Sequence, residues 1–419
     1  MGYKGRIANR IADVLALILR LGKEKTYRFF LDALWERYSV PGNSAHKLDI
    51  SLYCPDYVTP DSTDQPLVER IFTAYHKANR AQQQADAKFQ PSSMWRNVLS
   101  TAYADVIESL PDNDLRRFHH FLANFGAWRE ATAIEESQLI RICATDRHKR
   151  RHLEQKIIAP LVQWWLRSES NGRDLSALVL PRHGNLGGML VNDHLISPGS
   201  VFSEIHAHLI AGFLETERPI ISELGGGFGR LLYFLSRYQH RFCYVGFDLP
   251  ETLCCASYYL MKTFPEKRFL LYGEQDWNAE SLQEYDFLLL PSFEISKLPD
   301  NSVDLFINEN SLGEIEASAC QNYVHEICRC ANAFWHRNHE QRRFQFEGNT
   351  ASLLNREYPI PADKFVEVVR YGDLGPFVRA DRLDQDSDMF WYYYRSRHSC
   401  LRSTNSNTSS IAVVDVANN

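Results

Sequence analysis

A glycine-rich run in the second half of the sequence has the composition of a ligand-binding loop. It follows the apolar stretch 219–224 and comprises Gly225, Gly226, Gly227 and Gly229. Glycine lacks a Cβ, so such a run lets a strand turn sharply into a helix and lets the main chain pass close to a bound group. Glu223 precedes the run and completes the pattern E-x-G-x-G-x-G. We therefore predict that this loop contacts a ligand at the end of a strand.

A carboxylate at the end of the next apolar stretch, 242–247, forms the second element of the predicted site. This residue is Asp248, and Leu249 follows it. Ligands of open α/β sheets bind beyond the carboxyl ends of the strands, where a carboxylate can accept hydrogen bonds from ribose hydroxyls. The glycine loop and Asp248 together predict a nucleoside pocket at the carboxyl ends of two neighbouring parallel strands.

The spacing of the glycines favours one kind of nucleoside over another. A dinucleotide-binding loop reads G-x-G-x-x-G, and its third glycine would stand where this sequence has Arg230. An NAD-dependent oxidoreductase is therefore a weaker alternative. A second alternative is a nucleoside-binding or scaffolding protein that lacks catalysis. The pattern instead resembles motif I of the class I S-adenosylmethionine-dependent methyltransferases.

This resemblance implies a fold, a cofactor and a set of cofactor-binding residues. The implied fold is an α/β, Rossmann-like sheet of seven strands, and the implied cofactor is S-adenosyl-L-methionine. Phe293, after the apolar stretch 285–290, would form a wall beside the adenine, and Glu223 would orient the amino-acid end. The implied cofactor-binding residues are Glu223, Gly225, Gly226, Gly227, Gly229, Asp248, Leu249, Phe293 and Asn308.

Further segments resemble a narrower family, the sugar O-methyltransferases related to the nanchangmycin methyltransferase. They are Leu122–Gly126 in the N-terminal half, the glycine-rich stretch 184–188, the strand-like Leu305–Asn308 and the element Ser311–Glu314. The resemblance implies an O-methyltransferase that acts on a hydroxyl of a sugar or of a glycosylated natural product. A small-molecule or glycan acceptor is the expected partner.

Methyl transfer to a hydroxyl requires alignment and benefits from a general base. The reaction is an in-line displacement, so the protein must hold the acceptor oxygen against the methyl carbon. A base within hydrogen-bond reach accelerates such a step by about 10²–10⁴-fold. Glu314 is the first candidate because it lies in the segment that resembles the family's acceptor-facing element; Glu309 is the second and His325 the third. Each could instead be an ordinary solvated side chain. No ligand spacing predicts a metal ion.

The elements that must position these residues follow from the spacing of apolar residues. Helices are predicted at 66–90, 112–126 with Asp112 as N-cap, 147–168, 203–214, 230–238 and 319–335. Strands are predicted at 219–224, 242–247, 285–290, 303–307, 365–371 and 389–395. A basic amphipathic helix is predicted at 7–21, and it either packs on its own domain or lies on a membrane surface.

The sequence pattern changes near the polar run 168–174, from helical spacing to short strand-like runs separated by glycines, and we predict a domain boundary there. Residues 1–174 are predicted to form a helical region that serves as a lid, an acceptor surface or the interface of a homodimer. The methyltransferase domain is predicted at 175–400. The Ser/Asn-rich residues 401–419 are predicted to be a disordered tail.

Composition argues against several other classes of protein. The 419 residues are 44% apolar and 23% charged, and the net charge is −6, so neither global disorder nor a nucleic-acid partner is expected. Nine cysteines at mixed spacings fit reduced thiols in the cytoplasm better than a disulfide scaffold. No stretch of the sequence reaches the ~20 apolar residues of a membrane span.

Overall fold

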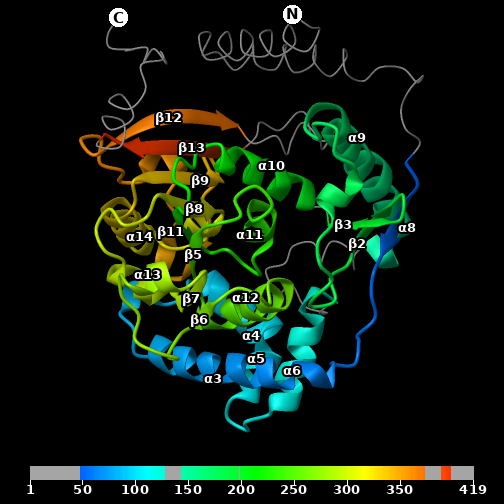
Figure 1. Ribbon diagram of the computed structural model, residues 1–419, viewed down its shortest axis with the longest axis horizontal. Coiled ribbons are helices and arrows are strands. Elements are labelled where there is room, and N and C mark those ends of the chain that lie inside the picture. Colours follow the sequence, from blue (N-terminus) through cyan, green and yellow to red (C-terminus); the bar gives the residue numbers. More distant parts are fainter. Residues whose placement is uncertain (1–47, 128–142, 198, 373–387, 398–419) are drawn as a thin grey trace, which may run out of the picture. The chain divides into compact units, whose positions relative to one another are not determined.

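The computed structural model describes residues 48–127, 143–197, 199–372 and 388–397 (Figure 1). These residues belong to one compact unit that begins at Leu48. The amphipathic helix predicted at 7–21 and the tail predicted at 401–419 lie outside the described residues.

The centre of the molecule is a sheet of eight strands in the order β12-β13-β9-β8-β4-β5-β7-β6 (Figure 1). Strands β6 to β9, β4 and β5 run parallel, whereas β13 runs antiparallel to both of its neighbours. The strands are β4 (Ile220–Leu224), β5 (Cys243–Asp248), β6 (Phe269–Leu271), β7 (Phe287–Pro291), β8 (Leu305–Glu309), β9 (Ala333–His339), β12 (Phe365–Gly372) and β13 (Met389–Ser396). The predicted α/β, Rossmann-like fold is confirmed, with one strand more than the seven expected.

Strand β9 corrects the prediction of a helix over 319–335. Helix α14 covers Ala317–Cys330, and the chain then enters the sheet at Ala333. Phe334 and Trp335 are fully buried between β8 and β13, where a strand satisfies its main-chain groups through two ladders. Strand β6 was also absent from the prediction, because three apolar residues are too short a run to separate from a loop.

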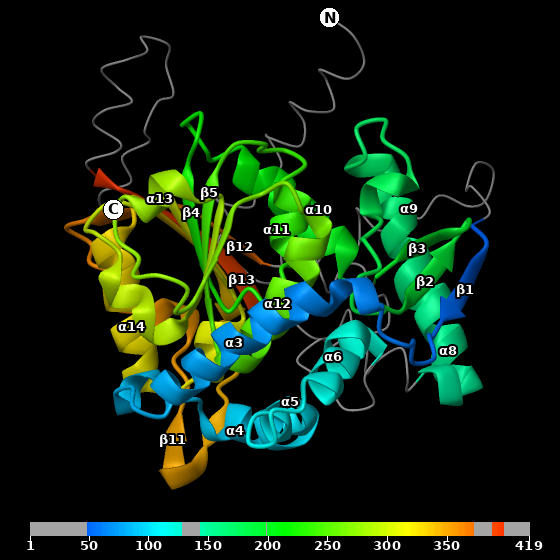
Figure 2. The ribbon, with the colours of Figure 1, turned by 60° about the horizontal axis from the view of Figure 1, so that its bottom comes forward.

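Helices cover both faces of the sheet. Figure 2 shows α10 (Ser200–Ala211), α11 (Arg230–Leu235) and α12 (Pro250–Thr263) on one side and α14 on the other. Side chains of β4 point to both faces of the sheet. Ile221 packs in the core layer of α11 and α12, and Leu224 packs in the layer of α14. The short helix α13 (Ser281–Glu284) precedes β7.

The helices of the N-terminal half pack directly against this α/β unit. They are α3 (Gln65–Gln82), α4 (Ser93–Ala102), α5 (Ala104–Ser109) and α6 (Leu115–Asn124). The hydroxyl of Tyr258 and the ammonium of Lys262, both on α12, donate to the carboxylate of Asp64 at 2.7 and 2.5 Å. Arg70 on α3 donates to the carbonyl of Phe269 at 2.8 Å and so covers the open side of the edge strand β6. Two predicted boundaries need correction: α3 ends before residue 90, and Asp114 rather than Asp112 caps α6.

A smaller layer contains α8 (Arg147–His152), a π-helical turn (Leu153–Ile158), α9 (Ala159–Ser168) and a three-stranded antiparallel sheet. Its strands are β1 (Ile50–Tyr53), β2 (Gly188–Val191) and β3 (His194–Ile196). β1 pairs with β2 across the boundary predicted near residue 174. A two-stranded hairpin, β10 (Gln345–Phe346) and β11 (Thr350–Ala351), completes the described strands.

The segment Leu122–Gly126, which resembles the narrower family, packs against the glycine-rich stretch 184–188. Gly184 has a φ of +77°, and a Cβ there would come within 2.2 Å of the ring of Phe125. The side-chain oxygen of Asn124 accepts a hydrogen bond from the N–H of Val58, and its side-chain amide donates to the carbonyl of Val58. The same oxygen accepts a hydrogen bond from the side-chain amide of Asn185 at 3.0 Å. These glycines therefore serve a tight packing contact between two distant parts of the chain.

Two chemical properties of the described residues bear on the sequence predictions. Every described cysteine is a free thiol. Within the described ranges, no helix is long and apolar enough to cross a membrane.

Candidate functional site

The glycine loop turns the chain from β4 into α11 by using conformations that favour glycine. Gly225, Gly227 and Gly229 have φ angles of +77°, +58° and +93°. A Cβ on Gly226 would lie within 2.8 Å of the Glu223 carboxylate, whereas a Cβ on Gly227 would meet nothing within 4 Å. The loop is thus packed tightly on its inner side and faces open space at Gly227, as a ligand-binding loop requires.

Asp248 lies beside this loop at the carboxyl end of β5, as predicted. The N–H of Gly227 donates to Oδ2 at 3.1 Å and the N–H of Leu249 donates to Oδ1 at 2.7 Å. Burial raises the pKa of Asp248 to about 7, although both hydrogen bonds favour the charged form. Leu249 is half-buried and forms the N-cap of α12. The two main-chain donors therefore do not offset the cost of burying the charge of this carboxyl group.

Glu223 lies beneath the loop and is 3% exposed. The hydroxyl of Tyr244 donates to its Oε2 at 2.6 Å. Burial raises the pKa of Glu223 to about 8, the bond from Tyr244 opposes this shift, and the nearby charges of Glu309 and Asp248 add to it. In this structure Glu223 supports the loop from below, and its role at the amino-acid end of a cofactor stays a prediction.

Asn308 and Phe293 occupy different surroundings at the same end of the sheet. Asn308 is fully buried; its amide donates to the carbonyl of Leu224 at 3.0 Å and to the hydroxyl of Ser311 at 2.5 Å. Its oxygen accepts a bond from Asn338 at 2.8 Å, so Asn308 joins three neighbouring strands. Phe293 lies on the 3-10 turn Ser292–Lys297, half-buried and edge-on to Tyr272. Contact of either residue with a cofactor stays a prediction.

Glu309 ends β8 and contacts a residue that the sequence analysis did not single out as a site residue. Its Oε1 lies 2.6 Å from Nδ1 of His206 on α10. Burial raises the pKa of Glu309, but the charge and hydrogen bond of His206 and the charges of Arg337 and Arg230 outweigh burial, so the net pKa is lowered. The contact joins residues 103 positions apart, and no local spacing could have indicated it.

Glu314 ends the 3-10 turn Ser311–Glu314 and contacts the helical N-terminal region. The indole N–H of Trp95 on α4 donates to its Oε2 at 3.0 Å, and the hydroxyl of Ser92 donates to its carbonyl at 2.9 Å. Neither Trp95 nor Ser92 was a sequence-based candidate, because both lie in the half of the chain without a recognisable motif. The structure thus brings Glu314 and α4 together.

His325 is not brought to this cluster. It is exposed on α14, ~12 Å along the helix from its first residue at about 1.5 Å per residue. In the part of the chain that the structure describes, no group of three or more His, Cys, Asp or Glu side chains could hold a metal ion. The prediction that the protein needs no metal stays untested by this observation.

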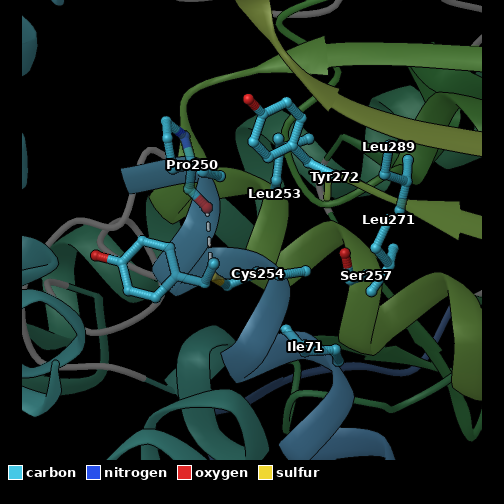
Figure 3. A pocket seen from close by; sticks show the side chains of 11 residues that line it. Ile71, Pro250, Leu253, Cys254, Ser257, Leu271, Tyr272 and Leu289 are labelled. Carbon is cyan, nitrogen blue, oxygen red and sulfur yellow. Dashed lines mark hydrogen bonds between the residues drawn. The ribbon is translucent and has the colours of Figure 1, made fainter. Parts of the chain in front are cut away.

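A cavity between α3 and α12 is too small to be the ligand site. Figure 3 shows that side chains such as Ile71, Leu253, Leu271 and Leu289 line it, and that Cys254 bonds back to the carbonyl of Pro250 at 3.3 Å. Its volume of about 20 Å³ suffices for about one water molecule.

Comparison with known proteins gives similarity at the level of the fold only. No family model matches the chain, and no curated protein matches it. Among solved structures, the geranyl diphosphate C-methyltransferase of Streptomyces coelicolor A3(2), in complex with S-adenosyl-L-homocysteine, is 9% identical, with a TM-score of 0.32 over 46% of this chain and 75% of that chain. The 1,6-didemethyltoxoflavin-N1-methyltransferase of Burkholderia thailandensis is 15% identical, with a TM-score of 0.31 over 46% of this chain and 76% of that chain. Similarity this low carries no information on the reaction or the acceptor.

Proposed function

We propose that the protein is an S-adenosylmethionine-dependent O-methyltransferase that acts on a hydroxyl of a sugar or of a glycosylated natural product. The observation that carries the proposal is the pairing of an open glycine loop with a half-buried carboxylate at the carboxyl ends of β4 and β5. The raised pKa of Asp248 supports it, because further donors from a ribose would offset the cost of burial that the two main-chain N–H groups offset only in part.

The residues around the loop suit the parts of the cofactor in different ways. Asp248 would accept hydrogen bonds from the ribose hydroxyls, and the open side of Gly227 would admit the nucleoside. Phe293 and Leu249 would flank the adenine. When bound, S-adenosylmethionine supplies an electrophilic methyl group. The protein then has to align the acceptor oxygen, exclude water and take up the hydroxyl proton.

The sugar-like acceptor rests on the resemblance of four segments to the sugar O-methyltransferases. Two of these, Leu122–Gly126 and the stretch 184–188, pack against each other. They therefore form one structural feature, and their resemblance to the family is not two independent matches. A net charge of −6 provides no broad basic surface for a polyanionic acceptor. We also propose that the helical N-terminal region forms one wall of the acceptor site, which the contact between Trp95 and Glu314 supports.

Calorimetry with S-adenosylhomocysteine tests the cofactor. We expect binding to the wild type, strong weakening in Asp248→Ala, and no binding of NAD⁺ in the same buffer. Failure of the wild type to bind would refute the proposal, and binding of NAD⁺ alone would point to an oxidoreductase.

Methyl transfer is tested by incubating the full chain with labelled S-adenosylmethionine and a panel of methyl glycosides and glycosylated aglycones, followed by mass spectrometry. We expect a mass gain of one methyl group on a hydroxyl. Transfer to amines or carbon atoms but to no hydroxyl would retain the methyltransferase and remove the O-methyl assignment.

A further inference from the structure

The carboxylate of Glu309 lies next to the glycine loop and not at the periphery of the site. In the parallel pairing of β4 with β8, Leu224 lies opposite Asn308. Glu309 therefore comes level with Gly225, the first residue of the loop, on the adjacent strand about 4.8 Å away. Its side chain is 18% exposed, against 4% for its partner His206. Of the two, Glu309 is the group that a bound molecule can reach.

The ring of His206 is held in place by packing. Trp391 lies 4.9 Å from it at 80° and Trp335 lies 5.4 Å from it at 59°, measured between ring centroids and planes. Both indoles are buried and belong to the sheet. With its ring fixed in this way, His206 presents Nδ1 to Oε1 of Glu309 and sets the orientation of the carboxylate.

Four elements around Glu309 contribute a charged or titratable group. These groups are His206 on α10, Arg230 on α11, Arg337 on β9 and Glu223 on β4. Three are basic, so the carboxylate remains ionised despite its burial. Side chains whose pKa is shifted by burial and by specific charged neighbours cluster at functional sites.

Glu314, the other acidic candidate, is placed differently. Its carboxylate accepts a hydrogen bond from the indole N–H of Trp95, which belongs to the wall formed by α4. This arrangement suits a residue that holds the N-terminal helices against the site.

We propose that Glu309 is the general base of the methyl transfer and that His206 is its positioning residue. The inference rests on the proposed function. In the reaction the acceptor oxygen bonds to the methyl carbon while the carbon–sulfur bond breaks and its electron pair goes to sulfur. The hydroxyl proton becomes strongly acidic as positive charge builds on oxygen, so an ionised carboxylate of low basicity can accept it. The proton ends on Glu309, beside His206.

The test compares Glu309→Gln, His206→Asn, His206→Leu and the control His208→Asn. His208 lies on the same helix and is exposed. Asn keeps a donor near the position of Nδ1 but carries no charge, whereas Leu keeps neither. Turnover is measured with labelled S-adenosylmethionine and the glycoside panel, and cofactor affinity with S-adenosylhomocysteine.

We expect Glu309→Gln to lower kcat by about 10²–10⁴-fold, the typical contribution of a general base, while the affinity for S-adenosylhomocysteine stays unchanged. His206→Leu lowers kcat, and His206→Asn restores part of it. In His206→Asn the acid limb of the pH–rate profile moves to higher pH, because Glu309 loses the neighbouring positive charge. A purely structural role of His206 would leave this limb in place. His208→Asn behaves like the wild type.

Wild-type turnover in Glu309→Gln would overturn the inference. So would loss of S-adenosylhomocysteine binding in that variant, since Glu309 would then belong to the cofactor site. Both results differ from failure of the proposed function, in which the wild type itself binds no cofactor.

Discussion

The two halves of the candidate site are built in different ways. The proposed cofactor half consists of the glycine loop and Asp248, whose carboxylate is held by main-chain N–H groups of the neighbouring turns. The proposed acceptor half consists of Glu309 and Glu314, whose carboxylates are held by side chains more than a hundred residues away in the sequence. The first half depends on the topology of the sheet alone. The second depends on how the N-terminal helices and α10 pack onto it, so the two halves should respond to different mutations.

The largest effect is expected from Asp248→Ala, which removes the proposed ribose acceptor. Each hydrogen bond to a charged group contributes about 1.5–3 kcal/mol, so the loss of two should raise the Kd for S-adenosylhomocysteine by about 10²–10⁴-fold. Calorimetry measures the affinity, and thermal unfolding of Asp248→Asn, which keeps the shape of the side chain, checks the fold. An unchanged affinity would show that Asp248 does not bind the cofactor.

Gly227→Ala should destabilise the fold and also obstruct the open side of the loop. A residue with a Cβ at a φ of +58° costs roughly 1–2 kcal/mol of unfolding free energy. Gly172→Ala is the matched control, since Gly172 has a φ of +86° and equal space around it but lies outside the site. Denaturant unfolding should show a similar loss in both variants, whereas only Gly227→Ala should weaken S-adenosylhomocysteine binding. Equal affinities in the two variants would contradict the assignment of the loop.

Cofactor affinity should depend on pH because Asp248 has a pKa of about 7. The proposed ribose contacts need the ionised carboxylate, so the proton must leave before binding when the pH is below 7. The Kd for S-adenosylhomocysteine should therefore rise about tenfold for each unit that the pH falls below the pKa, and it should level off above it. Calorimetry between pH 5.5 and 8 measures this slope. Asp248→Asn should abolish the slope; a slope that persists would assign it to another group.

The smallest effect is expected from Trp95→Phe, which keeps the ring but removes the donor to Glu314. Glu314 is half-buried, so water can replace the lost donor, and the net contribution of such a hydrogen bond is about 0.5–1.5 kcal/mol. The kcat/KM for the acceptor should therefore fall by about two- to tenfold. Binding of S-adenosylhomocysteine should not change. A comparable loss of cofactor affinity would show that the two halves are not independent.

The geometry of the proposed cofactor half could be predicted from sequence because each step is local or follows from a general rule. The spacing of glycines identifies the loop, and parallel strands place Asp248 beside it. The acceptor half could not be predicted in the same way. His206 and His208 are two residues apart on a helix, a spacing that indicates no shared site. The contact of His206 with Glu309 arises only when α10 packs over β8.

The errors in the fold have similar causes. Residues 319–335 continue an apolar pattern past the end of α14, and only the space between β8 and β13 makes the last part a strand. The N-cap at Asp114 differs from the predicted Asp112 by two residues, a typical uncertainty when several acidic residues precede a helix.

The contact of Arg70 with the carbonyl of Phe269 has a consequence for any attempt to shorten the protein. A chain cut at residue 174 would lose α3, and β6 would then present unpaired main-chain groups to solvent. Exposed edge strands of this kind pair with one another between molecules. We expect such a fragment to aggregate, because the N-terminal helices would no longer cover this edge of the sheet.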